Sequence, residues 1–124
     1  MLVDDEIDIS TVLKAGLQRK GLRVDTFNDP ILALESFVPG HYDLVISDVR
    51  MPNMNGLELA YELKKRDPSQ RIVFLTAYMD LFSELKKLFE RMDVLDVIQK
   101  PIGIGELSDR LETLVKKSNT TARS

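Results

Sequence analysis

Residues 44–56, LVISDVRMPNMNG, decide the fold class of this chain. The segment opens with three consecutive apolar residues, which is typical of a strand covered on both faces of a sheet. Asp48 ends this run, and a proline and an Asn-Gly pair then mark a loop before a helix predicted over residues 57–66. The segment therefore predicts a strand–loop–helix unit with a carboxylate at the carboxyl end of the strand.

The same alternation of strand and helix patterns continues on both sides of this unit. Strands are predicted over residues 2–3, which form the tail of a first strand, over residues 23–27, which alternate in the strand manner, and over residues 72–75 and 94–98. Stretches with helical spacing occupy residues 6–20, 31–38, 80–92 and 104–117. Asp29 is predicted to cap the second helix, with Pro30 at its first position. This alternation indicates an α/β fold, a mostly parallel sheet with helices on both faces and right-handed crossovers.

Polar residues follow the predicted strands at their carboxyl ends. They come from four separate strands and are Asp4, Asp5, Asp48, Thr76 and Lys100. In open parallel sheets, ligands bind outside the carboxyl ends of the strands, where the strand order reverses. We therefore expect these five side chains to meet at one edge of the sheet. Each alone has a plainer interpretation, such as a helix cap or a solvated lysine, and only their joint placement points to a site.

The chemistry of this predicted cluster suits phosphoryl transfer. Asp5 and Asp48 together match the one or two carboxylates by which Mg²⁺ is commonly held. A carboxylate such as Asp48 can also act as a nucleophile and form an aspartyl phosphate. Lys100 would place a positive charge beside one phosphoryl oxygen, and Thr76 would donate a hydroxyl to another. The chain has one histidine, His41, which we interpret as a solvated loop residue.

On these residues the chain resembles a receiver domain of the two-component response-regulator family. The resemblance rests on the acidic run from Asp4 to Glu6, SDVRMPNMNGLEL around Asp48, FLTAY with Thr76, and QKPI with Lys100. It implies a flavodoxin-like (βα)5 doubly wound parallel sheet with strand order 2-1-3-4-5. It also implies that Asp48 accepts a phosphoryl group from a histidine kinase, and that the domain is a signalling module that catalyses only its own phosphoryl transfer and dephosphorylation.

The resemblance further assigns roles around Asp48. Asp5, Asp48 and the main-chain carbonyl of Arg50 would hold Mg²⁺, and Asp4 would act through water or by pairing with Lys100. The bond from Lys100 to Pro101 would be cis. Phosphorylation would shift the conformation of the face formed by the fourth helix, the fifth strand and the fifth helix, which controls an output partner or domain.

Three features depart from the pattern of this family. The first strand is truncated, because only three residues precede Asp4. The switch position, three residues before Lys100, is usually aromatic and here is Val97, so Thr76 would keep its half of the switch without a ring to couple to. The segment between Thr76 and Lys100 is longer than usual, which predicts a lengthened or irregular fourth helix or following loop.

Three other functions are alternatives to this one. A phosphohydrolase with an aspartyl phosphate would need a second acid two residues after Asp48, where Arg50 stands. A nucleotide or flavin binder would need a glycine-rich or hydroxyl-rich loop after the first strand, where the acidic run from Asp4 to Glu6 would repel phosphate. A degenerate receiver that acts by protein contact alone stays possible because of Val97 and the short first strand.

Length and composition set the remaining expectations. The chain has 124 residues, which predicts one receiver domain over residues 1–117 and a flexible tail or linker over residues 118–124. The net charge of −3 argues against direct nucleic-acid binding, and the absence of Cys fits a cytoplasmic protein without disulfides. No apolar run approaches the roughly 20 residues of a membrane span. Met79, Leu81 and Phe89 could form an exposed partner or homodimer surface.

Overall fold

The computed structural model describes residues 1–77, 87, 94 and 96–123, with the backbone alone for residues 116–123. Within these residues the strands are β1 (Leu2–Val3), β2 (Thr26–Phe27), β3 (Val45–Asp48), β4 (Ile72–Thr76) and β5 (Asp96–Gln99), and the helices are α1 (Ile7–Arg19), α2 (Pro30–Ser36), α3 (Gly56–Arg66) and α5 (Ile104–Arg123). The predicted helix over residues 80–92 and the proposed surface around Met79 lie outside the described residues.

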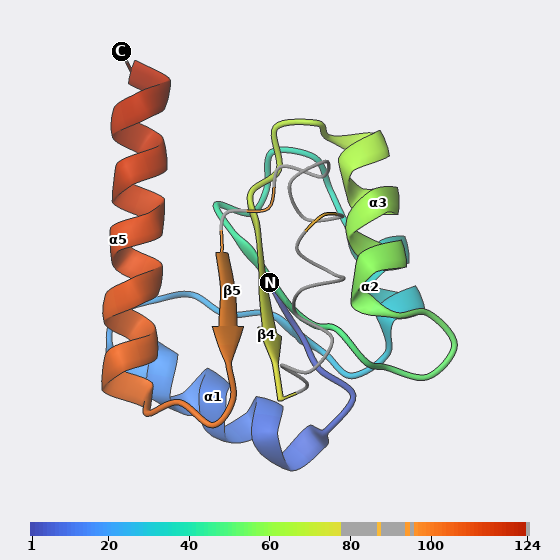
Figure 1. The fold of residues 1–124 in the computed structure, drawn as a ribbon, viewed down its shortest axis with the longest axis horizontal. Coiled ribbons are helices and arrows are strands. Elements are labelled where there is room, and N and C mark those ends of the chain that lie inside the picture. The colour runs from blue at the N-terminus through green and yellow to red at the C-terminus, as the bar shows by residue number, and fades with distance from the viewer. Residues whose placement is uncertain (78–86, 88–93, 95, 124) are drawn as a thin grey trace.

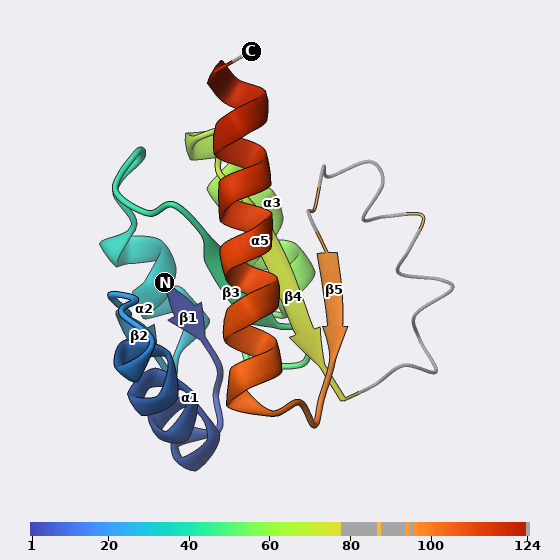
Figure 2. The ribbon, with the colours of Figure 1, turned by 90° about the vertical axis from the view of Figure 1, so that its left-hand side faces the viewer.

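The strands form one parallel sheet in the order β2-β1-β3-β4-β5 (Figures 1 and 2). This is the order that the resemblance implies, and the order of the strands across the sheet reverses between β1 and β3. The predicted short first strand is confirmed, since β1 pairs through only two residues with each neighbour. The backbone ladder continues past β1, because Asp4 N donates to Phe27 O at 3.0 Å.

Alternate residues of the strands point to opposite faces of the sheet and bury two separate cores. On one face, Val3, Val45 and Phe74 pack in a cluster with residues of α2 and α3. On the other, Leu2, Ile46 and Leu75 pack with residues of α1 and α5. Figure 1 shows these two helix pairs on opposite sides of the strands. Both faces of β3 and β4 are therefore covered, which explains their continuous apolar sequences.

Side chains hold the starts of two helices, α2 and α3. Asp29 accepts a hydrogen bond from Ile31 N at 2.9 Å, with Pro30 at the first helical position of α2. Asn55 and Glu58 form a reciprocal capping box at the start of α3. Because the cap fixes its first turn, α3 begins directly after the loop that follows Asp48.

Several boundaries differ from the sequence predictions. α2 ends at Ser36 rather than near residue 38, because Val38 precedes a proline and the α conformation is disfavoured there. β5 begins at Asp96, two residues later than predicted. The backbone of α5 is helical as far as Arg123, past the predicted end at residue 117, and the boundary between domain and tail stays a prediction. Among the described helices, none combines the length and apolarity needed to cross a membrane.

Candidate functional site

The carboxyl edge of the sheet gathers four of the five polar residues that the sequence singled out. Asp4 directly follows β1, Asp48 ends β3, Thr76 ends β4 and Lys100 directly follows β5. Parallel pairing sets β3, β4 and β5 side by side with their carboxyl ends together, and Lys100 N donates to Thr76 O at 2.8 Å. Asp4, Asp48, Thr76 and Lys100 therefore share one end of the sheet.

Lys100 bridges two of these carboxylates. Its ammonium group donates to Oδ2 of Asp4 at 2.7 Å and to Oδ2 of Asp48 at 3.3 Å. The side chains of Lys100, Asp4 and Asp48 are only 12%, 1% and 7% exposed, so water screens these ion pairs weakly. The site thus has two buried negative charges and one positive charge at its centre.

The surroundings of Asp48 disfavour its charged form. Burial raises the pKa of Asp48 above its ordinary value, and the nearby charge of Asp4 acts in the same direction. The charge of Lys100 opposes both effects only in part, as does the hydrogen bond that Val49 N donates to Asp48 Oδ1 at 2.8 Å. Burial would lower the pKa of Lys100, but its hydrogen bond to Asp4 and the charges of both carboxylates outweigh burial and raise it. A second cation beside Asp48 would relieve the excess negative charge.

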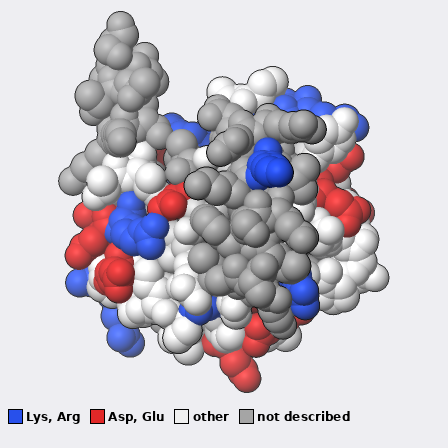
Figure 3. All heavy atoms as spheres, viewed as in Figure 1, with Lys and Arg blue, Asp and Glu red and all other residues white. Residues whose placement is uncertain are grey.

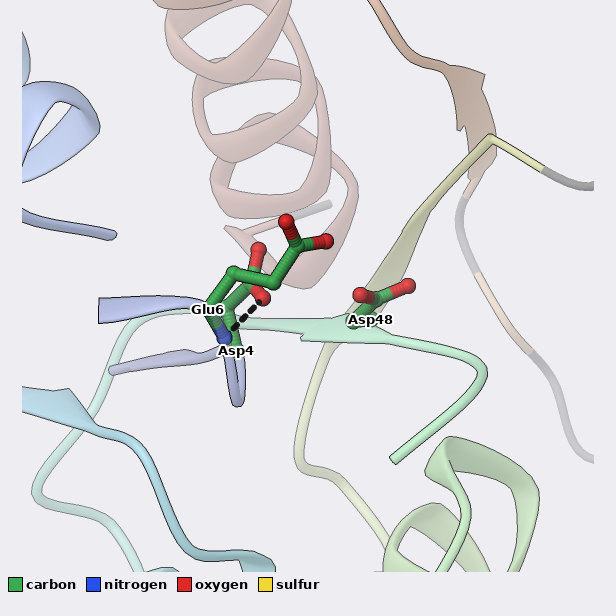
Figure 4. Close-up of side chains that lie close together, drawn as sticks. All are labelled: Asp4, Glu6 and Asp48. Carbon is green, nitrogen blue, oxygen red and sulfur yellow. Dashed lines mark hydrogen bonds between the residues drawn. The ribbon is translucent and has the colours of Figure 1, made fainter. Parts of the chain in front are cut away.

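The third acidic side chain at the site belongs to Glu6. Oxygens of Asp4, Glu6 and Asp48 all lie within 4.8 Å of one another (Figure 4). Glu6 N donates to Asp4 Oδ1 at 3.0 Å, which closes a tight turn after β1 and brings the Glu6 side chain back toward Asp4. The resemblance assigns Asp5 as the direct ligand in this segment. The grouped acids are instead Asp4, Glu6 and Asp48, and the role of Asp5 stays a prediction.

The donor set of this cluster fits a hard divalent cation. All three side chains offer carboxylate oxygens, two of them buried, and oxygen is the ligand atom that Mg²⁺ and Ca²⁺ prefer. The charges also fit, because three carboxylates face one ammonium group. The residues present are therefore compatible with the Mg²⁺ that the resemblance implies.

Gly56 makes the close approach of α3 to Asp48 possible. A Cβ atom at this position would lie 2.1 Å from the main-chain oxygen of Asp48 and 3.0 Å from Val49 Cα. The short distance is held by a hydrogen bond from Gly56 N to Val49 O at 2.7 Å. The loop that carries Arg50 is thus closed against its own strand, and its geometry depends on the absence of a side chain at residue 56.

The predicted switch residues lie on neighbouring strands. Thr76 is buried at the end of β4. Val97 is half-buried in β5, pairs with Phe74 and packs against the core on the side of α2 and α3. The peptide bond between Lys100 and Pro101 is cis, as the resemblance implies.

The surface gives a further test of the charge argument. In Figure 3, the described basic and acidic side chains of this face are interspersed and form no continuous basic stripe. The mixture of signs agrees with the small net charge of −3.

Three residues at the site were not given a role from sequence: Glu6, Gly56 and Asn28. The signal for Asn28 was available, because it directly follows β2 as Asp4 follows β1. Glu6 extends the acidic pair, and Gly56 follows the loop after Asp48. Their contacts, however, depend on chain segments far away in the sequence.

Comparison with known families agrees with this geometry. Residues 1–112 match the family described as response regulator receiver domain. The transcriptional regulatory protein ZraR of Klebsiella oxytoca is 35% identical over 107 residues, which cover 86% of this chain and 24% of ZraR. QseB of Escherichia coli O157:H7 is 30% identical over 122 residues, covering 98% of this chain and 55% of QseB. The chain therefore spans about half or less of the length of these two relatives.

Solved structures support the same assignment. The response regulator TrrA of Thermotoga maritima, crystallised in complex with Mg²⁺-BeF, is 36% identical with a TM-score of 0.79, and the match covers 91% of this chain and 95% of TrrA. The non-phosphorylated HemR receiver domain of Leptospira biflexa is 29% identical with a TM-score of 0.82, covering 92% of this chain and 90% of HemR.

Proposed function

Because the chain belongs to the family of response regulator receiver domains, we propose that Asp48 accepts a phosphoryl group from a histidine kinase in a two-component signalling system. The observation that carries this proposal is the buried group of Asp4, Asp48 and Lys100 at the carboxyl edge of the sheet. A buried carboxylate with a raised pKa, next to a lysine and further acids, is the arrangement expected of a reactive group rather than of a structural ion pair.

The proposed chemical step is a displacement at phosphorus. One carboxylate oxygen of the ionised Asp48 forms the new O–P bond, and the P–N bond of the phosphohistidine breaks. The electron pair of that bond stays on the histidine nitrogen, which takes up a proton from water. Val49 N holds Asp48 Oδ1 and so fixes the plane of the carboxylate. Lys100, held by Asp4, would exchange its contact with Asp48 Oδ2 for one with a phosphoryl oxygen, and Thr76 would donate its hydroxyl to another.

The proposed cofactor is Mg²⁺, which when bound would neutralise charge on the phosphoryl oxygens. Asp48, Asp5 and the main-chain carbonyl of Arg50 are the ligands that the resemblance assigns. Glu6 joins Asp4 and Asp48 in the cluster of Figure 4 and is a further candidate ligand. Asp4 also accepts a hydrogen bond from Lys100, which supports the indirect role proposed for it. The relative TrrA was crystallised in complex with Mg²⁺-BeF, which supports Mg²⁺ as the proposed cofactor.

The proposed output is a shift between two conformations of the domain. The face concerned includes β5 and α5, which Arg110 and Asp96 join by an ion pair. Val97 has no ring to rotate, so we assign the switch to the hydroxyl of Thr76 and to Lys100. The relatives ZraR and QseB are named as transcriptional regulators, and an output domain or protein partner is therefore part of the proposal, as are a possible homodimer and a cytoplasmic location.

A degenerate receiver that works by protein contact alone is the second candidate. Val97 and the two-residue β1 favour it. The buried Asp4, Asp48 and Lys100 favour phosphorylation instead, because a protein without the reaction gains nothing from two desolvated carboxylates.

Intact mass spectrometry after incubation with phosphoramidate and Mg²⁺ tests the proposal. One added phosphoryl group is expected on the wild type and on Asp109→Asn, whose side chain is exposed on α5. Asp48→Asn is expected to gain none. A folded wild-type protein without an adduct would remove the phosphoacceptor function and leave the degenerate receiver.

A further inference from the structure

Asn28 joins two loops at the carboxyl edge of the sheet. It directly follows β2, and its Nδ2 donates to the main-chain oxygen of Asp4 and to Oγ of Ser10, both at 2.8 Å. Asp4 and Ser10 flank the acidic turn after β1. Asn28 therefore ties both ends of this turn to the strand beside it.

Ser10 connects Asn28 by hydrogen bonds to the backbone of the acidic turn. Its hydroxyl donates to Ile7 O at 3.0 Å, and its main-chain N donates to Glu6 O at 3.0 Å. Ser10 is 2% exposed, so its hydroxyl has little access to water as a substitute partner. The bonds of Asn28 and Ser10 thus run from β2 to the backbone of Glu6.

Four hydrogen bonds fix the conformation of Asp4, and one of them comes from Asn28. Asp4 N donates to Phe27 O, Asp4 Oδ1 accepts from Glu6 N, and Asp4 Oδ2 accepts from Lys100. Among the hydrogen bonds of the described residues, the main-chain oxygen of Asp4 accepts from Asn28 alone. This oxygen sets the peptide plane by which the chain leaves β1, and hence the direction of the two acids that follow.

A carboxamide is the side chain that these contacts require. Nδ2 has two hydrogen atoms and gives one to each oxygen. An aspartate at this position would turn a second acceptor toward the main-chain oxygen of Asp4, and it would find the Ser10 hydroxyl already donating to Ile7. Alanine would leave both oxygens without this donor, and since Asn28 is itself exposed, it would open no cavity.

We infer that Asn28 is a positioning residue for the cation site: its bonds to Asp4 and Ser10 hold the acidic turn so that Asp4 and Glu6 face Asp48. This inference rests on the proposed function, because it concerns the cation of that site. Asn28 does not belong to the acidic cluster itself and acts through the backbone of Asp4. Loss of a residue that orients a metal ligand typically weakens metal affinity 10–100-fold.

The test is an NMR titration with Mg²⁺ of ¹⁵N-labelled wild type, Asn28→Ala, Asn28→Asp and Thr11→Ala. Thr11 is the control, because it also bonds Ile7 O from an exposed position in α1 but does not touch Asp4. We expect both Asn28 variants to bind Mg²⁺ about tenfold more weakly than the wild type, at the lower end of that range. Thr11→Ala should stay within twofold of the wild type. Urea unfolding of each variant confirms that it is folded under the conditions of the titration.

Asn28→Asp distinguishes an effect of positioning on Mg²⁺ affinity from an effect of added negative charge. If charge alone mattered, Asn28→Asp would add a carboxylate near the site and bind Mg²⁺ more tightly. Affinity within twofold of the wild type in Asn28→Ala, or tighter binding in Asn28→Asp, would overturn the inference. So would an equal loss in Thr11→Ala.

A metal-free measurement keeps the inference separate from the proposed function. Without Mg²⁺, hydrogen exchange of the Glu6 amide should be at least severalfold faster in Asn28→Ala than in the wild type, because the turn that holds this amide against Asp4 is released. A wild type that binds no Mg²⁺ would count against the proposed cation, while unchanged Glu6 exchange in Asn28→Ala would count against the positioning role.

Discussion

The ammonium group of Lys100 lies 2.7 Å from Asp4, closer than its 3.3 Å contact with Asp48. Lys100 is therefore anchored mainly by the acid that we do not assign as nucleophile. Its longer contact with Asp48 is the one that a phosphoryl group would replace. Because Asp4 holds Lys100, its ammonium group can stay in place while its second contact changes between the unphosphorylated and the phosphorylated domain.

Lys100→Ala should lower stability and weaken the response to phosphorylation. The change leaves Asp4 and Asp48 buried without a counter-charge, and breaking a buried pair in this way costs about 3–5 kcal/mol. Phosphoramidate should still modify Asp48, but the amide shifts on β5 and α5 should change less than in the wild type. Urea unfolding and ¹⁵N NMR measure the two effects. Shift changes equal to those of the wild type would contradict the role given to Lys100.

Asp48→Asn should raise the free energy of unfolding at neutral pH when EDTA removes divalent cations. The pKa of Asp48 is raised in the folded state, so the folded protein holds a proton on Asp48 more readily than the unfolded chain. The contribution of Asp48 to stability is then fully present below its ordinary pKa of 3.8 and is lost as the pH rises through its folded-state pKa. Asparagine stays neutral and keeps Lys100 paired with Asp4.

The pH dependence gives this prediction its control. The advantage of Asp48→Asn over the wild type should be largest at neutral pH and shrink as the pH falls through the folded-state pKa. Added Mg²⁺ should stabilise the wild type more than the variant, because ligand binding to the folded state shifts unfolding by mass action. Urea unfolding over a pH series measures both, and a variant that is less stable than the wild type at neutral pH would refute the electrostatic argument.

Glu6→Gln should weaken Mg²⁺ binding about fivefold. A unit charge about 5 Å from a divalent ion is worth roughly 1–2 kcal/mol in water before salt screening. Glu35→Gln is the matched control, because Glu35 is an exposed acid on α2 outside the cluster. Asp5→Asn belongs in the same NMR titration, since a larger loss there than in Glu6→Gln would support Asp5 as the direct ligand. No loss in Glu6→Gln would show that its place in the cluster is incidental to the cation.

The fold could be predicted because its signals are local. The uninterrupted apolar residues of β3 and β4 indicate burial on both faces, and each strand is followed by a recognisable loop and helix start. Asp29 and Pro30 mark the start of α2 by their chemistry alone. The edge of the site followed from the same pattern, since a parallel sheet brings the carboxyl ends of its strands together.

The arrangement within the site could not be predicted in the same way. Whether Asp5 or Glu6 faces Asp48 depends on the turn after β1, and that turn is held by Asn28, which lies 24 residues from Asp4 in sequence. Lys100 comes from 96 residues away. Such contacts leave no periodic pattern in the sequence, so composition and spacing identified the acidic segment but not which of its side chains join the cluster.

Gly56→Ala should lower both the stability of the protein and its rate of phosphorylation, although Gly56 is not one of the acidic or basic residues of the site. The new Cβ would stand 2.1 Å from the main-chain oxygen of Asp48, and backbone on both sides must move to admit it. Overpacking of this kind costs about 1–3 kcal/mol, and here the displaced atoms belong to the nucleophile's own residue. We therefore expect lower stability in urea and a phosphorylation rate by phosphoramidate reduced at least severalfold.

Gly105→Ala is the control for this last prediction. Gly105 lies in the first turn of α5, and apart from its chain neighbours and the nearby backbone of α5, no heavy atom lies within 4 Å of the position its Cβ would occupy. Alanine has the higher helix propensity, by up to about 1 kcal/mol in a helix interior, so this variant should be as stable as the wild type or more so, with an unchanged rate. If Gly56→Ala were as stable and as quickly phosphorylated as Gly105→Ala, the loop after Asp48 would be able to move and admit the Cβ atom. The close approach of α3 would then not be what fixes the carboxylate. Equal stability with a slower rate would instead locate the effect of Gly56 in the placement of Asp48 alone.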